Sequence, residues 1–61
     1  MSYTDEQRRE FLQALDRADF EVSDWEAEFL KSNLKREDFS YNQRAVIDSL
    51  IERYAARLKW P

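Results

Sequence analysis

Three copies of one helix-start pattern, in a chain with no glycine and a single proline as its last residue, constrain the fold most strongly. The pattern is Ser/Thr-x-x-Glu/Gln. Its hydroxyl accepts from the backbone N–H three residues on, and the Glu or Gln side chain reaches back to the first N–H. It occurs at Thr4–Gln7, Ser23–Glu26 and Ser40–Gln43. Because nothing inside the chain breaks a helix, the pattern predicts three helices and an all-α fold.

Each pattern opens a run in which apolar residues recur at helical spacing. The runs predict helices over about residues 5–19, 24–35 and 41–59. The predicted apolar arcs hold Phe11, Leu12, Ala14, Leu15 and Ala18 in the first helix, Trp25, Phe29, Leu30 and Leu34 in the second, and Val46, Ile47, Leu50, Ile51, Tyr54 and Leu58 in the third.

The connections between the helices are short and carry Phe20, Val22 and Phe39. Short connections favour consecutive helices that pack together, and we expect these three side chains to close the ends of the core. No linker or repeat divides the 61 residues, so we expect one domain. Two arrangements stay open: a compact three-helix bundle, or a helical hairpin with a third helix packed against it.

The composition excludes several kinds of chemistry. Without Cys or His, the chain has no disulfide, no thiolate metal ligand and neither the commonest zinc ligand nor the commonest acid–base catalyst. Its carboxylates lie on solvent-facing positions, whereas catalytic carboxylate pairs need a concave, partly dry pocket. No glycine-rich loop or nucleophile elbow is present. We therefore expect a protein that is not an enzyme and that uses no cofactor or metal.

The amino-terminal residues 1–10 are polar, and no segment approaches the roughly 20 apolar residues that cross a bilayer. We expect a cytoplasmic protein without a membrane partner. Residues 1–21 carry three Lys/Arg against six Asp/Glu, and residues 35–61 carry six against four. Aromatic residues make up 15% of the chain, more than so small a core can readily bury, so we expect some of them on the surface.

The acidic residues of the second helix allow more than one functional interpretation. Asp24 and Glu28 lie one turn apart and could contact a divalent ion, but such sites take about six oxygen ligands. We interpret the pair as a solvated acidic face and as a second candidate for partner binding. Glu26 falls inside the apolar arc, and we expect it to complete the capping box with Ser23.

The third helix carries the first candidate for partner binding, because Arg53, Arg57 and Trp60 follow one flank. Like charges four residues apart destabilise an isolated helix slightly, so a compensating partner is expected. That partner could be an acidic protein or a phosphate, with Trp60 as an anchor. Alternatively, the arginines pair internally with Glu26 or Glu28 and Trp60 caps the end of the bundle.

About residues 22–54 resemble a short helical segment that recurs in bacteriophage and bacterial proteins, often attached to proteins that handle DNA. The residues that carry the resemblance are Val22-Ser23-Asp24-Trp25-Glu26-Ala27-Glu28-Phe29-Leu30-Lys31-Ser32, then Phe39-Ser40-Tyr41-Asn42-Gln43-Arg44, and then Ile47, Leu50 and Ile51. The resemblance implies a phage or mobile-element setting and an accessory role near DNA. It implies no catalytic residue.

These observations favour a small, non-catalytic, protein-binding accessory or regulatory factor that modulates a larger host or phage protein. Two alternatives stay open. The chain could be a nucleic-acid-binding domain that uses its basic third helix, or a self-associating structural protein whose homo-oligomer buries the spare aromatics. Steep weakening of binding by salt would indicate nucleic acid.

Overall fold

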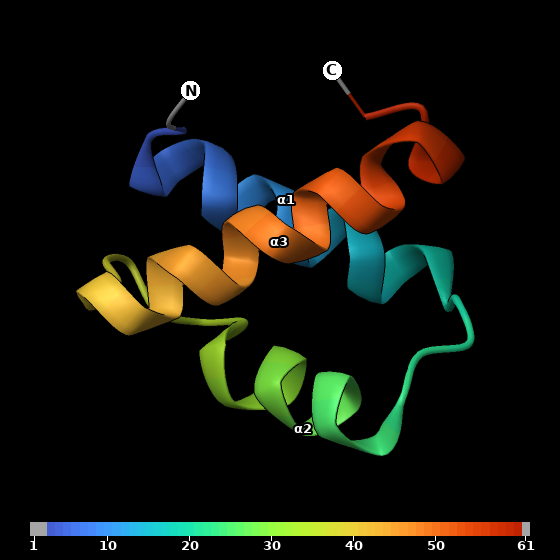
Figure 1. Cartoon of the computed structure of the whole chain (residues 1–61), viewed down its shortest axis with the longest axis horizontal. Helices are drawn as coiled ribbons and strands as arrows, with labels where there is room; N and C mark the ends of the chain where they lie inside the picture. The colour runs from blue at the N-terminus through green and yellow to red at the C-terminus, as the bar shows by residue number, and fades with distance from the viewer. Residues whose placement is uncertain (1–2, 61) are drawn as a thin grey trace.

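The computed structural model describes residues 3–60 and contains three α-helices with short connections (Figure 1). They are α1 (Asp5–Ala18), α2 (Asp24–Asn33) and α3 (Tyr41–Leu58). The described chain is 72% helical and contains no strand, which confirms the predicted all-α class. No helix within residues 3–60 is long and apolar enough to cross a membrane.

All three predicted helix starts are confirmed. In each, the cap hydroxyl accepts from the backbone N–H three residues on, and the Glu or Gln side chain accepts from the cap's own N–H at 2.8–3.0 Å. The pairs are Thr4–Gln7, Ser23–Glu26 and Ser40–Gln43. These bonds satisfy N–H groups that a helix start otherwise leaves without a partner.

The helices end one or two residues earlier than the sequence predicts. Asp19 (φ 57°) and Lys59 (φ 55°) take the left-handed conformation directly after α1 and α3. Their N–H groups donate back to carbonyls of the last turn, including Asp16 O and Ala56 O. Glycine usually fills this position, and in a chain without glycine an aspartate and a lysine must adopt it.

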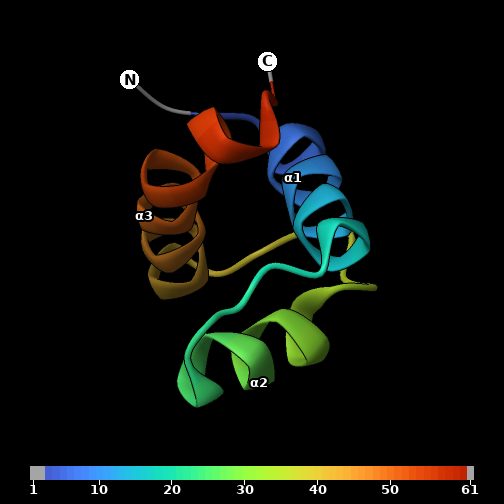
Figure 2. The ribbon, with the colours of Figure 1, turned by 90° about the vertical axis from the view of Figure 1, so that its right-hand side faces the viewer.

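The helices form a three-helix bundle in which α3 crosses α1 and α2 lies below both (Figures 1 and 2). The core lies between them and draws on all three helices and on the connection before α3. Its buried side chains are Phe11, Leu12, Leu15, Leu30, Phe39, Ile47, Leu50, Ile51 and Tyr54. Phe20 and Val22 are half-buried against this core, as expected of residues that close its ends.

The rotation of α2 about its axis differs from the predicted apolar arc. Trp25 is 60% exposed and Phe29 is half-buried, whereas Glu26 and Leu30 face the core. The reason is that the carboxylate of Glu26 bonds to Tyr54 of α3 as well as to its own cap. This double role turns Glu26 inward and leaves Trp25 on the outside.

Candidate protein-binding surface

The predicted flank of α3 is largely occupied by contacts within the chain. Arg53 Nη1 lies 2.7 Å from Glu26 Oε2, and its side chain remains 65% exposed. The guanidinium of Arg57 lies 5.8 Å from the centre of the Tyr54 ring, in a cation–π contact. Arg53 thus forms the internal pair with Glu26 that the sequence left open.

Trp60 is half-buried at the end of the bundle. Its ring meets Phe11 edge to face at a centroid distance of 5.4 Å and Tyr3 at 6.2 Å. Phe11 is fully buried, so Trp60 packs against the core through this contact. Arg53 and Arg57 are exposed on α3, whereas Trp60 is half-buried at the end of the bundle.

Glu26 connects α2 to α3. Its Oε1 accepts from Ser23 N–H at 3.0 Å and from the Tyr54 hydroxyl at 2.9 Å, while Oε2 accepts from Arg53. Burial raises the pKa of Glu26, but these hydrogen bonds and the charge of Arg53 outweigh it, so the pKa lies below its ordinary value. The hydrogen bond to Glu26, followed by burial, raises the pKa of Tyr54. The charged carboxylate of Glu26 therefore links α2 to α3 through its hydrogen bonds.

Four alternating charges connect α1 to α3. Arg8 is buried and makes a two-pronged bond to Asp48, at 2.8 and 3.1 Å, and a third bond to Asp5 at 2.9 Å. Asp5 also accepts twice from Arg44. Arg8 was not predicted as a buried residue, although its spacing from Phe11 and Leu12 places it inside the apolar arc of α1.

Trp25 is a large, mostly exposed aromatic residue on the outer side of α2. Its ring stacks on Phe29 at a centroid distance of 5.6 Å and an interplanar angle of 14°. The exposed carboxylates of Asp24 and Glu28 are its neighbours on the helix. The second candidate pair from the sequence analysis therefore flanks an exposed aromatic stack.

A shallow hollow of about 230 Å³ lies beside this stack and is lined by Trp25, Glu28, Phe29, Ser32 and Asn33. The Asn33 amide donates to the Phe29 carbonyl at 2.8 Å, but its buried Oδ1 has no hydrogen-bond partner within residues 3–60. An unsatisfied buried acceptor costs about 1–3 kcal/mol. This side of α2 is therefore not optimised for the stability of the isolated chain.

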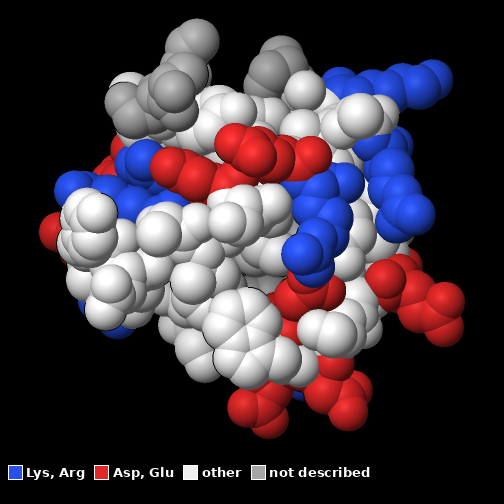
Figure 3. Space-filling model, in the orientation of Figure 1, with Lys and Arg blue, Asp and Glu red and all other residues white. Residues whose placement is uncertain are grey.

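The side of α3 that carries Arg53, the residue paired with Glu26 of α2, is also uncharged over the first half of the helix. Asn42 and Ser49 are exposed and Val46 is half-buried, all on one side of the helix. Figure 3 shows an uncharged surface that continues from this part of α3 down to α2, with acidic side chains below it. We call this surface the α2–α3 face and define it by Trp25, Phe29, Asn42, Val46 and Ser49.

No protein-family model, curated protein or solved structure matches this chain. Within residues 3–60, no three Asp or Glu side chains lie close enough to hold a metal ion. The geometry of the surface is the basis for the function proposed below.

Proposed function

We propose that this protein is a non-catalytic accessory factor that binds another protein through the α2–α3 face. One observation carries the proposal: Trp25 is 60% exposed although it is stacked on a second aromatic ring. Tryptophan is enriched among the residues that contribute most to protein–protein affinity. An uncharged area around an aromatic anchor, rimmed by charges, is the usual anatomy of such an interface.

The stack on Phe29 makes Trp25 a suitable anchor. Phe29 is half-buried against the core, so the ring under Trp25 is held by the fold. Binding an already ordered side chain loses less conformational entropy than ordering a free one, and the saving is about 0.5–1.5 kcal/mol for each side chain. The partner thus meets a pre-organised ring.

The charges around Trp25 indicate what the partner presents. Asp24 and Glu28 are exposed carboxylates that take part in no ion pair within the described residues. They favour a partner with Lys or Arg beside its aromatic-binding pocket. A symmetric homodimer centred on Trp25 would instead bring carboxylates of two copies together, which disfavours self-association through this face.

The biological setting rests on the resemblance of residues 22–54 to helical segments of phage and bacterial proteins that handle DNA. We infer that the protein acts beside a larger phage or host protein and alters what that protein does. The resemblance includes Trp25, Glu26 and Phe29, so the anchor and its support belong to the same stretch.

Affinity capture with matched baits tests this function. The wild-type chain and the Gln13→Ala control, which alters an exposed position on α1, should retain the same protein from a nuclease-treated lysate. The Trp25→Ala bait should lose that protein while it keeps wild-type helicity, because the side chain is mostly exposed. Equal retention by all three baits would exclude the α2–α3 face. Capture that is seen only from an untreated lysate and falls steeply with salt would indicate nucleic acid instead.

A further inference from the structure

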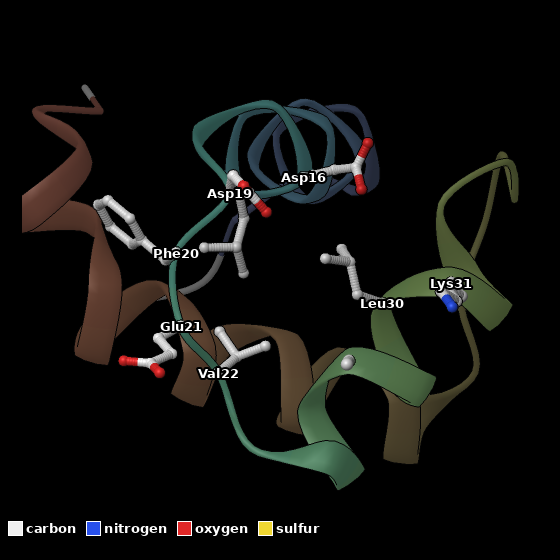
Figure 4. Close-up of a pocket in the computed structure, with 9 residues that line it drawn as sticks. Asp16, Asp19, Phe20, Glu21, Val22, Leu30 and Lys31 are labelled. Carbon is white, nitrogen blue, oxygen red and sulfur yellow. The ribbon is translucent and has the colours of Figure 1, made fainter.

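A groove of about 670 Å³ opens on the α1 side of α2. It lies between the carboxyl end of α1, the connection that follows it, and α2 (Figure 4). Its apolar lining residues are Leu15, Phe20, Val22, Ala27 and Leu30, and Figure 4 shows Val22 and Leu30 directed into the space. This volume lies within the roughly 300–1,000 Å³ of typical ligand sites.

The groove has one acidic edge. Asp16 and Asp19 lie on its α1 side (Figure 4), both are exposed, and neither forms an ion pair within residues 3–60. They also stand at the carboxyl end of a helix, where the helix dipole already places negative charge. Arg17, the basic residue of that last turn, does not line the groove. Among the residues that line the α1 side of the groove, none is basic.

The opposite edge of the groove is basic. Lys31 of α2 lines it (Figure 4) and takes part in no ion pair in the described chain. The groove therefore carries negative charge along α1 and, through Glu21, on the connection after it, an apolar floor, and positive charge along α2. Such an arrangement distinguishes the two ends of a bound segment.

We infer that this groove binds a cationic amphipathic segment of a protein. An apolar side chain of the segment packs against Leu15, Val22 and Leu30, and its Lys or Arg lies beside Asp16 and Asp19. Charge complementarity selects this occupant: unpaired carboxylates at a helix carboxyl end attract a cation, and the apolar floor attracts the rest of the segment. The groove lies on the opposite flank of α2 from Trp25, so this site is separate from the α2–α3 face.

A model peptide provides a direct probe of the groove. The full chain, labelled with ¹⁵N, is titrated with a capped synthetic amphipathic helix made of Leu, Lys and Ala. We expect amide shifts to change at Val22, Ala27 and Leu30. Peptides in which Glu replaces Lys, or Ser replaces Leu, should bind at least about tenfold more weakly, since each lacks one of the two complementary features. Absence of shifts, or shifts confined to the residues around Trp25, would overturn the inference.

Matched variants separate a specific groove from general attraction to an acidic protein. Asp16→Asn combined with Asp19→Asn removes both carboxylates, and asparagine tolerates the left-handed conformation of position 19. Glu10→Gln combined with Glu52→Gln makes the same change in net charge at exposed positions that do not line the groove. The first pair should weaken peptide binding at least about tenfold. Equal weakening by both pairs, or by neither, would contradict the groove.

The proposals for the groove and for the α2–α3 face can be tested independently. Trp25→Ala should leave the affinity for the model peptide unchanged, because Trp25 does not line the groove. If that variant lost the peptide, the peptide would be binding the α2–α3 face and the groove would have no role.

Discussion

At the scale of single residues, the two left-handed positions show how the chain ends its helices without glycine. A side chain with a Cβ pays about 1–2 kcal/mol to adopt this conformation, while Asp and Asn pay less than most. Lys59 (φ 55°) is therefore the more costly of the two. Its conformation lets the Trp60 N–H donate to the Ala55 carbonyl at 3.1 Å and turns the chain at the end of α3.

Replacement of Lys59 by glycine should stabilise the protein. We expect Lys59→Gly to raise the free energy of unfolding by about 0.5–1 kcal/mol, since glycine adopts positive φ without a steric penalty. Thermal melts followed by circular dichroism measure the change. Lys59→Ala is the control, because it removes the side-chain atoms beyond Cβ but keeps the Cβ, and it should give no gain. A destabilised Lys59→Gly variant would mean that the lysine side chain itself stabilises the turn.

Glu26 shows where residue-level prediction from sequence ends. The capping pattern predicts its bond to the Ser23 N–H, and the structure confirms that bond. Its bonds to Tyr54 and Arg53 join residues 28 and 27 positions apart. No local pattern encodes such a contact, because it depends on how α2 is placed against α3.

At the scale of elements, the buried and exposed arginines of the charge network between α1 and α3 should contribute differently to the free energy of unfolding. The Arg8 side chain is 6% exposed, whereas that of Arg44 is 47% exposed. We expect Arg8→Ala to cost about 3 kcal/mol, because it leaves the partly buried Asp48 without a partner and removes one of the two arginines that bond to Asp5. Arg44→Ala should cost no more than about 1 kcal/mol, as for other exposed ion pairs. Chemical denaturation of both variants checks the ranking, and equal costs would contradict it.

The carboxylates that tie the helices together should make the fold sensitive to acid. Hydrogen bonds from Arg44, and further ones from Arg8, lower the pKa of Asp5 below its ordinary value of 3.8, although burial opposes them. The pKa of Glu26 likewise lies below its ordinary value of 4.5. A carboxylate whose pKa is lower in the folded state stabilises the fold fully when the pH is above its unfolded pKa. This stabilisation is lost as the pH falls through the folded pKa. The melting temperature should therefore drop below about pH 4.5.

The Glu26→Gln variant isolates one part of this acid sensitivity. It should be less stable than the wild type near neutral pH, and its melting temperature should fall less between about pH 4.5 and about pH 2.5, since one titrating group is gone. Melts across this range, with Glu10→Gln as a control at an exposed position, measure the difference. An unchanged slope in Glu26→Gln would show that this carboxylate does not contribute.

Helix starts could be predicted from the sequence because each capping box is a local hydrogen-bond pattern. Helix ends were less accurate: α2 ends at Asn33, not near residue 35, and α1 and α3 end at left-handed residues that no glycine marks. The predicted rotation of α2 about its axis was also wrong, because Trp25 is exposed. Hydrophobic periodicity placed the indole in the core, whereas the bonds of Glu26 to α3 turn it outward.

At the scale of the whole molecule, the surfaces depend on how the helices are placed. Asp24 and Glu28 could be singled out as candidates from the sequence, but the exposure of Trp25 could not be predicted, because it follows from the rotation of α2. The groove beside Asp16 and Asp19 needs the carboxyl end of α1 to face α2 across a short connection. The flank of Arg53, Arg57 and Trp60 remains a testable alternative, although Trp60 packs against Phe11.

The affinity of the captured partner for single-site variants tests the central claim most directly. Isothermal titration should show that Trp25→Ala weakens binding at least about tenfold, or about 1.4 kcal/mol, and that Trp25→Phe weakens it less. Arg57→Glu, which changes an exposed residue of the α3 flank, should alter the dissociation constant less than about twofold. If Trp25→Ala bound as tightly as the wild type while Arg57→Glu lost affinity, the binding surface would lie on α3 and not on the α2–α3 face.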